Sequence, residues 1–249
     1  MHTHTLVFAG ETVTKRYISW DRGEHRREWA ALRHVWNHAP GLAPQPLAAD
    51  LDANPPHIEM SVVPGEPLRG ALTPEQTAAL TTAIKELWKV PTTSELAPWA
   101  DDLAFARRLT DGPRPATDAA AEAYESALAW WEGPDPELLR IRPQIVLGHR
   151  DPNLANYLWD GDRVRIVDFE DARISDPATE AALLAEHVST RELDIDGLCA
   201  RLGVDGRRLL AARRLWSMYW LSLFLARHAL DRADSQAERV LALLTQSAP

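Results

Sequence analysis

Three oxygen-bearing side chains late in the chain have the spacing to form one chemical group. Asn156 stands at the start of a short apolar run, and Asp151 lies in the segment before it. Asp168 directly follows a second apolar run. The pair Asp160-Gly161 between the runs predicts a hairpin turn, which folds one strand back on the other. We therefore expect Asn156 and Asp168 to meet at the open end of the hairpin, with Asp151 in the loop that leads to that end.

The residue types in this set are those that hold a hard cation and move a proton. Mg²⁺ takes oxygen ligands and commonly keeps waters and substrate phosphate oxygens around it. Two of the three side chains can serve as metal ligands, which leaves Asp151 to accept the proton of an attacking hydroxyl. The set therefore predicts a metal site beside a proton acceptor.

The first part of the chain is expected to form strands and one helix. β-branched and aromatic residues predict the strands, and Lys15 lies in the middle of the second one. Asp21 and Glu24 have the spacing of a capping box, which predicts the start of a helix that contains Glu28 and ends at Pro40. The strands expected here cover residues 5–8, 12–19, 45–49 and 57–63.

The pattern changes after a turn-rich connection over residues 64–72. From Thr73 onward apolar residues recur at helical spacing, and Pro74 stands at a favoured first position of a helix. One group of short strands, which includes the hairpin described above, interrupts the helices. Beyond this first helix we expect helices over 98–110, 116–132, 177–189 and 206–246, and strands over 145–147, 156–159 and 164–167.

The motifs around the three side chains resemble those of a known superfamily. The stretch HRDPNLAN (149–156) resembles the catalytic loop of protein-kinase-like enzymes, and VDFE (167–170) resembles their metal-binding segment. Only seven residues separate Asp168 from Asp176, which leaves no room for the long activation segment of a protein kinase. The chain is therefore similar to aminoglycoside phosphotransferases and their choline-kinase-like relatives.

This resemblance implies roles for the residues of the loop and hairpin. Asp151 would orient the acceptor hydroxyl, while Asn156 and Asp168 would bind Mg²⁺. Asp151 is then the catalytic residue of a phosphoryl transfer that depends on positioning and charge neutralisation more than on covalent chemistry. His149 could be a general base, but the resemblance favours a structural role in bracing the loop.

The same resemblance implies a nucleotide site in the first part of the chain. Lys15 would contact the α and β phosphates of ATP, and Glu28 would pair with Lys15. The backbone near Met60 and Val62 would hold the adenine. Without the downstream motifs, Lys15 and Glu28 would be interpreted as an ordinary exposed pair worth ~0 to 1 kcal/mol.

The fold implied is a bilobal, protein-kinase-like α+β fold with the active site in the cleft between the lobes. We expect a small antiparallel sheet plus one helix over residues 1–63, a hinge over 64–72, and a mainly helical catalytic and substrate lobe over 73–249. Relatives usually begin with an additional strand and a loop over the phosphates. Here that loop is expected to be missing or shortened, which should weaken nucleotide binding.

Composition and charge limit the partners. With a net charge of −9, the chain is not expected to bind nucleic acid. Most of the negative charge lies after residue 70. If that part binds a substrate, the charge favours a cation; otherwise the acidic residues serve as a solubilising surface. The lone Cys199 excludes an internal disulfide, and no stretch is long and apolar enough to be a signal or membrane segment, so a cytoplasmic location is expected.

Four further features differ in how far the sequence assigns them a role. Arg150 stands where small-molecule kinases usually have glycine, and it could crowd the acceptor or brace a carboxylate such as Glu170. Trp216, Tyr219 and Trp220 share a helix face that could stack on a cationic ligand but more often packs in a core. Asp176 is expected to be structural, and Glu180 is assigned no role.

The leading hypothesis is an ATP- and Mg²⁺-dependent kinase that phosphorylates a hydroxyl on a small, cationic metabolite or antibiotic. One alternative is a kinase for choline, ethanolamine, homoserine or a fructosamine-like sugar. Another is a pseudokinase that binds nucleotide without transferring phosphate, although the full set of carboxylates argues against it.

Overall fold

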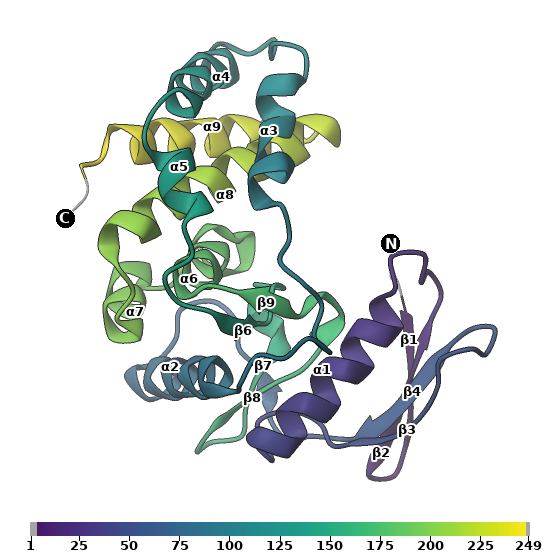
Figure 1. Cartoon of the computed structure of the whole chain (residues 1–249). Helices are drawn as coiled ribbons and strands as arrows, with labels where there is room; N and C mark the ends of the chain where they lie inside the picture. The colour runs from purple at the N-terminus through teal and green to yellow at the C-terminus, as the bar shows by residue number, and fades with distance from the viewer. Residues whose placement is uncertain (1–3, 248–249) are drawn as a thin grey trace.

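A four-stranded antiparallel sheet forms the first part of the chain in the computed structural model, which describes residues 4–247 (Figure 1). The strands run in the order β1-β2-β4-β3, so that β2 lies inside the sheet with a partner on each side. Gly10 adopts φ +62° in the turn between β1 and β2, a backbone conformation that glycine reaches without strain. The strands are β1 (His4–Ala9), β2 (Thr12–Tyr17), β3 (Pro46–Asp50) and β4 (His57–Ser61).

The helix α1 (Glu24–His38) packs against this sheet and ends before Pro40, as the sequence predicts. Leu32 and Val35 are fully buried on its inner face, and burial of such a side chain is worth about 1.5–3 kcal/mol. The predicted capping box is wrong: Gly23 is the N-cap residue and no side chain caps the helix. Glu24 instead accepts a hydrogen bond from Arg22 Nε at 2.7 Å, which removes it from the capping role.

The second part of the chain is mainly helical. The helix α2 begins with a capping box at Thr73 and Gln76 and has proline at its first position. The helices are α2 (Pro74–Lys89), α3 (Asp102–Asp111), α4 (Asp118–Trp131), α5 (Asp135–Arg140), α6 (Pro177–Glu186), α7 (Ile195–Leu202), α8 (Gly206–Ala226) and α9 (Leu230–Thr245). The sequence analysis did not predict α5 and α7, and the single helix expected over 206–246 is two helices that separate at His228, where φ is +53°.

Two small sheets lie between the four-stranded sheet and the helices (Figure 1). One joins β5 (Glu66–Pro67), β7 (Tyr157–Trp159) and β8 (Val164–Ile166), and the other pairs β6 (Val146–Gly148) with β9 (Arg173–Ser175). The predicted hairpin is therefore present as β7 and β8. The Asp160 carboxylate accepts the backbone N–H groups of Asp162 and Arg163 and thereby closes its turn.

Two details differ from the expectation. Asn156 ends a short 3-10 helix, η1 (Leu154–Asn156), and is not part of the strand. The segment expected as a strand over 145–147 pairs with β9, which the sequence analysis did not predict, because three residues carry too little pattern to mark a strand. The β5 strand lies in the predicted hinge and pairs with β7, so this connection is attached to the helical part.

One hydrophobic core runs from the first sheet through α1 and α2 to the small strands, and a second core joins α3, α4, α8 and α9. The first core includes Ile58 from β4, Leu80 from α2 and Ile166 from β8, all fully buried. The α+β architecture predicted from the sequence is thus confirmed. No helix within residues 4–247 combines the length and the apolar character needed to cross a membrane.

Candidate active site

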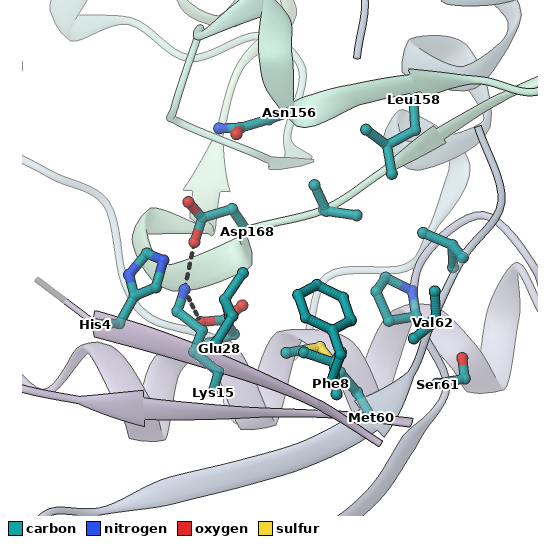
Figure 2. Close-up of a pocket in the computed structure, with 15 residues that line it drawn as sticks. His4, Phe8, Lys15, Glu28, Met60, Ser61, Val62, Asn156, Leu158 and Asp168 are labelled. Carbon is teal, nitrogen blue, oxygen red and sulfur yellow. Dashed lines mark hydrogen bonds and ion pairs between the residues drawn. The ribbon is translucent and has the colours of Figure 1, made fainter. Parts of the chain in front are cut away.

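Lys15 lies at the centre of a buried group of charges. Its side chain projects from β2 and is only 2% exposed. Its Nζ donates a hydrogen bond to Glu28 Oε2 at 2.7 Å and a second to Asp168 (Figure 2). The same Nζ lies 3.2 Å from Glu170 Oε2. The predicted pair of Lys15 and Glu28 is therefore present, and it is connected directly to the residue expected to bind metal.

Packing of α1 brings these charges together. The helix contacts the short 3-10 helix η2 (Phe169–Asp171), which directly follows Asp168. Arg27 Nε donates to the carbonyl oxygen of Glu170 at 2.8 Å, which fixes α1 against this segment. One turn of α1 thus supplies both the partner of Lys15 and the contact that holds the Asp168 segment in place.

The electrostatics keep Lys15 charged. Burial lowers its pKa, but the carboxylates of Glu28, Asp168 and Glu170 outweigh burial and hold the pKa above its ordinary value. Tyr17, also on β2, donates from its hydroxyl to Glu28 Oε2 at 2.5 Å. The sequence analysis missed Tyr17, although its position two residues after Lys15 places it on the same face of the strand.

His149 connects the loop that carries Asp151 to the strand that leads to Asp168. One of its ring nitrogens lies 2.8 Å from the carbonyl oxygen of Asp151 and the other lies 2.9 Å from that of Val167. The ring also packs edge-on against Phe169, with the centroids 5.0 Å apart. These contacts are those of the bracing role expected for His149.

Asp151 and Asn156 are joined by a direct hydrogen bond. Asn156 Nδ2 donates to Asp151 Oδ2 at 2.8 Å, and the N–H of Asn153 donates to Asp151 Oδ1 at 3.1 Å. These donors fix the orientation of the Asp151 carboxylate. They also use the Asn156 amide nitrogen, so that its amide oxygen is the atom available to a cation.

Asn156 and Asp168 fit the chemistry of a magnesium site. Both side chains line one cavity, and they supply an amide oxygen and a carboxylate, which are hard oxygen ligands (Figure 2). Asp168 adopts φ +67°, an uncommon backbone conformation of the kind that clusters at functional sites. A further cluster of potential ligands, His4, Asp168 and Glu170, has its ligand atoms within 4.8 Å of one another, and Lys15 pairs with both of its carboxylates.

The cavity lined by Asn156 and Asp168 has a volume of about 250 Å³ and lies between the first sheet and the hairpin. Met60 and Val62, the residues predicted to hold an adenine, line it together with Lys15. Most of the remaining wall is apolar and comes from both sides: Leu6, Phe8, Val13, Pro44, Leu158 and Val167. This cavity therefore combines an apolar region with a charged end.

A second cavity, of about 470 Å³, opens on the other side of Asp151. Its wall contains aromatic side chains from α3 and α8, four arginines and the carboxylates of Asp151 and Asp171. Asp151 lines this cavity and Asn156 lines the first one, so the hydrogen bond between them lies where the two cavities approach each other.

Arg150 connects the loop that carries Asp151 to the helices α3 and α6. Its guanidinium makes two hydrogen bonds to the carboxylate of Asp102, the first residue of α3, and its backbone N–H donates to Glu180 Oε2 at 3.2 Å. The carboxylate expected as its partner, Glu170, pairs with Lys15 instead. The guanidinium also lies 5.2 Å from the ring centroid of Trp216, so this aromatic face already has a cation against it.

Two acidic residues at the loop were missed by the sequence analysis. The Glu180 side chain is 8% exposed and accepts hydrogen bonds from Ser175 and from the loop, and burial raises the pKa of its carboxyl group. It lies so close to the loop that a Cβ at Gly148 would meet it at 2.3 Å. Asp102 lies 48 residues from Arg150 in the chain, and no local pattern links the two.

Asp176 has the structural role that the sequence predicts. Its carboxylate caps α6 by accepting the N–H groups of Ala178 and Thr179 at 3.1 and 3.2 Å, and the hydroxyl of Thr179 at 2.7 Å. Arg208 from α8 lies 3.4 Å from the same carboxylate. The contacts hold the first turn of α6 against α8.

A small antiparallel sheet with a buried Lys–Glu pair, facing a loop and hairpin that present Asp, Asn and Asp, is the arrangement of protein-kinase-like phosphotransferases. The chain belongs to the phosphotransferase enzyme family (APH), whose family model matches residues 12–216. A search of curated proteins finds no match.

Solved structures share this fold at low sequence identity. A choline/ethanolamine kinase family protein from Mesorhizobium loti superposes with a TM-score of 0.75 at 16% identity, over 99% of this chain and 86% of that one. The choline kinase LicA from Streptococcus pneumoniae gives 0.64 at 10% identity, over 97% and 89%. An aminoglycoside phosphotransferase, APH(2")-IIa, in a ternary complex with streptomycin and ATP gives 0.64 at 16% identity, over 96% and 91%.

Proposed function

We propose that this phosphotransferase uses ATP and Mg²⁺ to phosphorylate a hydroxyl group of a small molecule. The observation that carries the proposal is the 2.8 Å hydrogen bond between Asn156 and Asp151, which links the residue expected to bind metal in one cavity to the residue expected to accept a proton in the other. A phosphoryl group that passes from one bound molecule to another needs such a junction.

The first cavity would hold the nucleotide. An adenine would pack between apolar side chains such as Phe8 and Leu158, with its polar edge at the backbone near Met60 and Val62. Lys15 would bind the α and β phosphates from the charged end, held in place by Glu28. The use of ATP is supported by the structural relative that was solved with ATP and streptomycin.

Asn156 and Asp168 would hold Mg²⁺ through an amide oxygen and a carboxylate. When bound, the ion would neutralise charge on the phosphates and on the transferred group. Lys15 contributes a second positive charge to the same cavity, because Nζ stays protonated between its three carboxylates.

Asp151 would orient the acceptor and take its proton. The acceptor hydroxyl oxygen forms a bond to the γ phosphorus of ATP, and the bond from that phosphorus to the β–γ bridging oxygen breaks, which releases ADP. The hydroxyl proton passes to the Asp151 carboxylate and then to water. Hydrogen bonds from Asn153 and Asn156 hold the carboxylate in one orientation while this happens.

Amino alcohols and amino sugars are the acceptors to test first. The structural relatives are described as a choline/ethanolamine kinase family protein, a choline kinase and an aminoglycoside phosphotransferase, so amino alcohols and amino sugars are natural first candidates. The sequence also favours a cationic acceptor because the helical part is acidic. The cytoplasmic location stays a prediction from the sequence.

The test is phosphate transfer itself. Purified protein is incubated with ATP and Mg²⁺ and a panel of hydroxyl compounds, with ADP release as the first readout and phosphorus NMR of the acceptor as the second. We expect at least one acceptor to raise ADP release well above hydrolysis by water and to carry the phosphate as an ester. A protein that binds Mg-ATP but transfers phosphate to no acceptor and to no water would contradict the proposal and favour a nucleotide-sensing role.

A further inference from the structure

The cavity beside Asp151 has the opposite charge balance from the chain as a whole. The chain has a net charge of −9, yet this wall has two carboxylates and four arginines: Arg22, Arg27, Arg150 and Arg173. Charge at a distance is screened by salt within about 10 Å, so the groups in the wall decide what the cavity attracts. Which of these charged groups lack a partner therefore decides the kind of ligand that the cavity takes.

Three of these four arginines already have a carboxylate partner. Each of the three pairs uses a different acidic residue, so little of their charge is left over for a ligand. The pairs are Arg22 with Glu24 at 2.7 Å, Arg27 with Asp171 at 3.5 Å, and Arg150 with Asp102. The main effect of these three ion pairs is to hold the arginine side chains of the wall in place.

Arg173 differs from the other three. Its Nε donates to the carbonyl oxygen of Asp171 at 3.3 Å, and it forms no ion pair with any carboxylate within residues 4–247. Its side chain is half-buried, and burial together with the nearby charges of Arg150 and Arg27 lowers its pKa more than the carboxylates of Asp171 and Asp102 raise it. A half-buried guanidinium among other cations is stabilised when an anion binds beside it.

The position of Arg173 ties it to the catalytic loop. It lies on β9 and pairs directly with Gly148 of β6. Gly148 in turn lies three residues before Asp151 in the chain. Arg173 and Asp151 both line the second cavity, and Arg173 is not part of the wall of the first one. An anion on Arg173 would therefore belong to the acceptor and not to the nucleotide.

The rest of the wall is mainly aromatic. Tyr219 and Trp220 pack edge to face with their ring centroids 5.7 Å apart, and Trp216 has the guanidinium of Arg150 near its ring. The rings that suggested a cation cage from the sequence are thus engaged with one another and with an arginine. They offer an apolar surface to a ligand.

We propose that the acceptor carries an anionic group, a carboxylate or a phosphate, that Arg173 binds while Asp151 takes the proton of a hydroxyl on the same molecule. The apolar part of this acceptor packs on Trp216, Tyr219 and Trp220. The inference rests on the proposed phosphoryl transfer and leaves its step unchanged: the hydroxyl oxygen attacks the γ phosphorus, ADP leaves, and the anionic group stays ionised throughout. It replaces the expectation of a cationic acceptor, which was drawn from the charge of a whole segment.

Matched acceptors test this proposal in the ADP-release assay with ATP and Mg²⁺. One arm pairs hydroxy acids with their primary amides, and a second pairs sugar phosphates with the free sugars. Amino alcohols and aminoglycosides form a third arm. We expect kcat/KM for the better anionic arm to exceed that of its neutral partners by about 10-fold or more, which is the size of effect that a charge-assisted hydrogen bond supplies. The difference should appear in KM and not in kcat.

Arg173→Gln should erase this preference, because acid and amide would then meet the same neutral side chain at position 173. Arg173→Lys should restore part of it, which a purely structural role would not explain. Arg201→Gln, the same change of charge on the exposed face of α7, is the matched control and should leave the preference intact. The KM for ATP serves as a check that each variant keeps its first cavity.

The outcomes separate this inference from the proposed function. Turnover confined to neutral or amine-bearing acceptors, or a preference for acids that survives in Arg173→Gln, overturns the inference and leaves the phosphotransferase standing. Failure of both anionic arms also counts against the inference. Failure of all three arms, with phosphate transferred to no acceptor and to no water, counts against the proposed function itself.

Discussion

Lys15 Nζ donates a hydrogen bond to Glu28 Oε2 at 2.7 Å inside a site where both side chains are almost completely buried. The same ammonium group bonds Asp168 across the cavity, 153 residues away in the chain. Three carboxylates therefore share one cation, and the position of the expected metal ligand depends on a strand and a helix from the N-terminal part of the chain.

Loss of Lys15 should destabilise the protein as well as inactivate it. Lys15→Met leaves the carboxylates buried without their cation, and removal of one partner of a buried pair typically costs about 3–5 kcal/mol. We expect urea unfolding at pH 7 to show a loss of this order. Because the pKa of Lys15 is raised above its ordinary 10.5, the stabilisation should be complete below about pH 10 and decline only at higher pH.

Exposed Arg26, which pairs with Asp52 on the surface, provides the comparison. Arg26→Met should change the free energy of unfolding by no more than about 1 kcal/mol. Equal losses in the free energy of unfolding for Lys15→Met and Arg26→Met would show that the buried group of charges stabilises the protein no more than an exposed pair does.

The brace between Arg150 and Asp102 should be measurable as a coupling energy. Arg150→Ala removes the two hydrogen bonds to Asp102 and the contact with Trp216, and we expect a loss of about 2–4 kcal/mol. In a double-mutant cycle with Asp102→Ala, the two losses should be strongly non-additive. Additive losses would mean that the two side chains act independently.

The exposed pair of Arg107 and Asp111 on α3 is the control for this cycle, with Nε and Oδ1 3.5 Å apart. Its coupling energy should not exceed about 0.5 kcal/mol, the usual value for an i,i+4 helix pair.

Asp176→Ala should loosen α6 without direct loss of a catalytic group. The substitution removes a side chain that accepts three hydrogen bonds at the N-terminus of the helix, and we expect a cost of about 1–3 kcal/mol in thermal or urea unfolding. Thr117, the N-cap residue of α4, makes no such bond, so Thr117→Ala should be nearly neutral. A large loss of stability in Thr117→Ala but not in Asp176→Ala would reverse the assignment.

Cys199 should be unreactive in the folded protein. It is buried on α7, and burial raises the pKa of its thiol to about 11 from an ordinary 9.0. Two pKa units mean about 100-fold less thiolate at pH 8, in addition to the steric protection of the side chain. Ellman's reagent should therefore label native protein at least about 100-fold more slowly than protein unfolded in guanidinium, and rapid labelling of native protein would show that α7 opens readily.

The parts of the site that the sequence predicts are those with a local signal. Asp160-Gly161 marks the turn, and the turn alone brings Asn156 and Asp168 to one end of a hairpin. Asp176 is recognisable because a helix follows it directly. Lys15 and Glu28 are far from these residues in the chain, and only the resemblance to a family links the two groups.

The parts that the sequence does not predict depend on long-range packing. The partner of Arg150 is Asp102, which reaches it only because α3 packs on α8 beside the loop. The short strand β9 and the helix α7 have too few residues for a clear periodicity. The side chains that line the second cavity are not predictable for a similar reason, because a sum of charges over the sequence does not show which charged residues face inward.

The measurement that tests the central claim most directly compares Asp151→Asn with Asp168→Asn in the whole chain. For any acceptor that supports ADP release, Asp151→Asn should lower kcat by about 10²- to 10⁴-fold and keep the affinity for Mg-ATP within a few fold. Asp168→Asn should lower turnover and also weaken the binding of Mg-ATP. Near-normal turnover in Asp151→Asn, or Mg-ATP binding that is indifferent to Asp168, would contradict the division of roles between the two carboxylates.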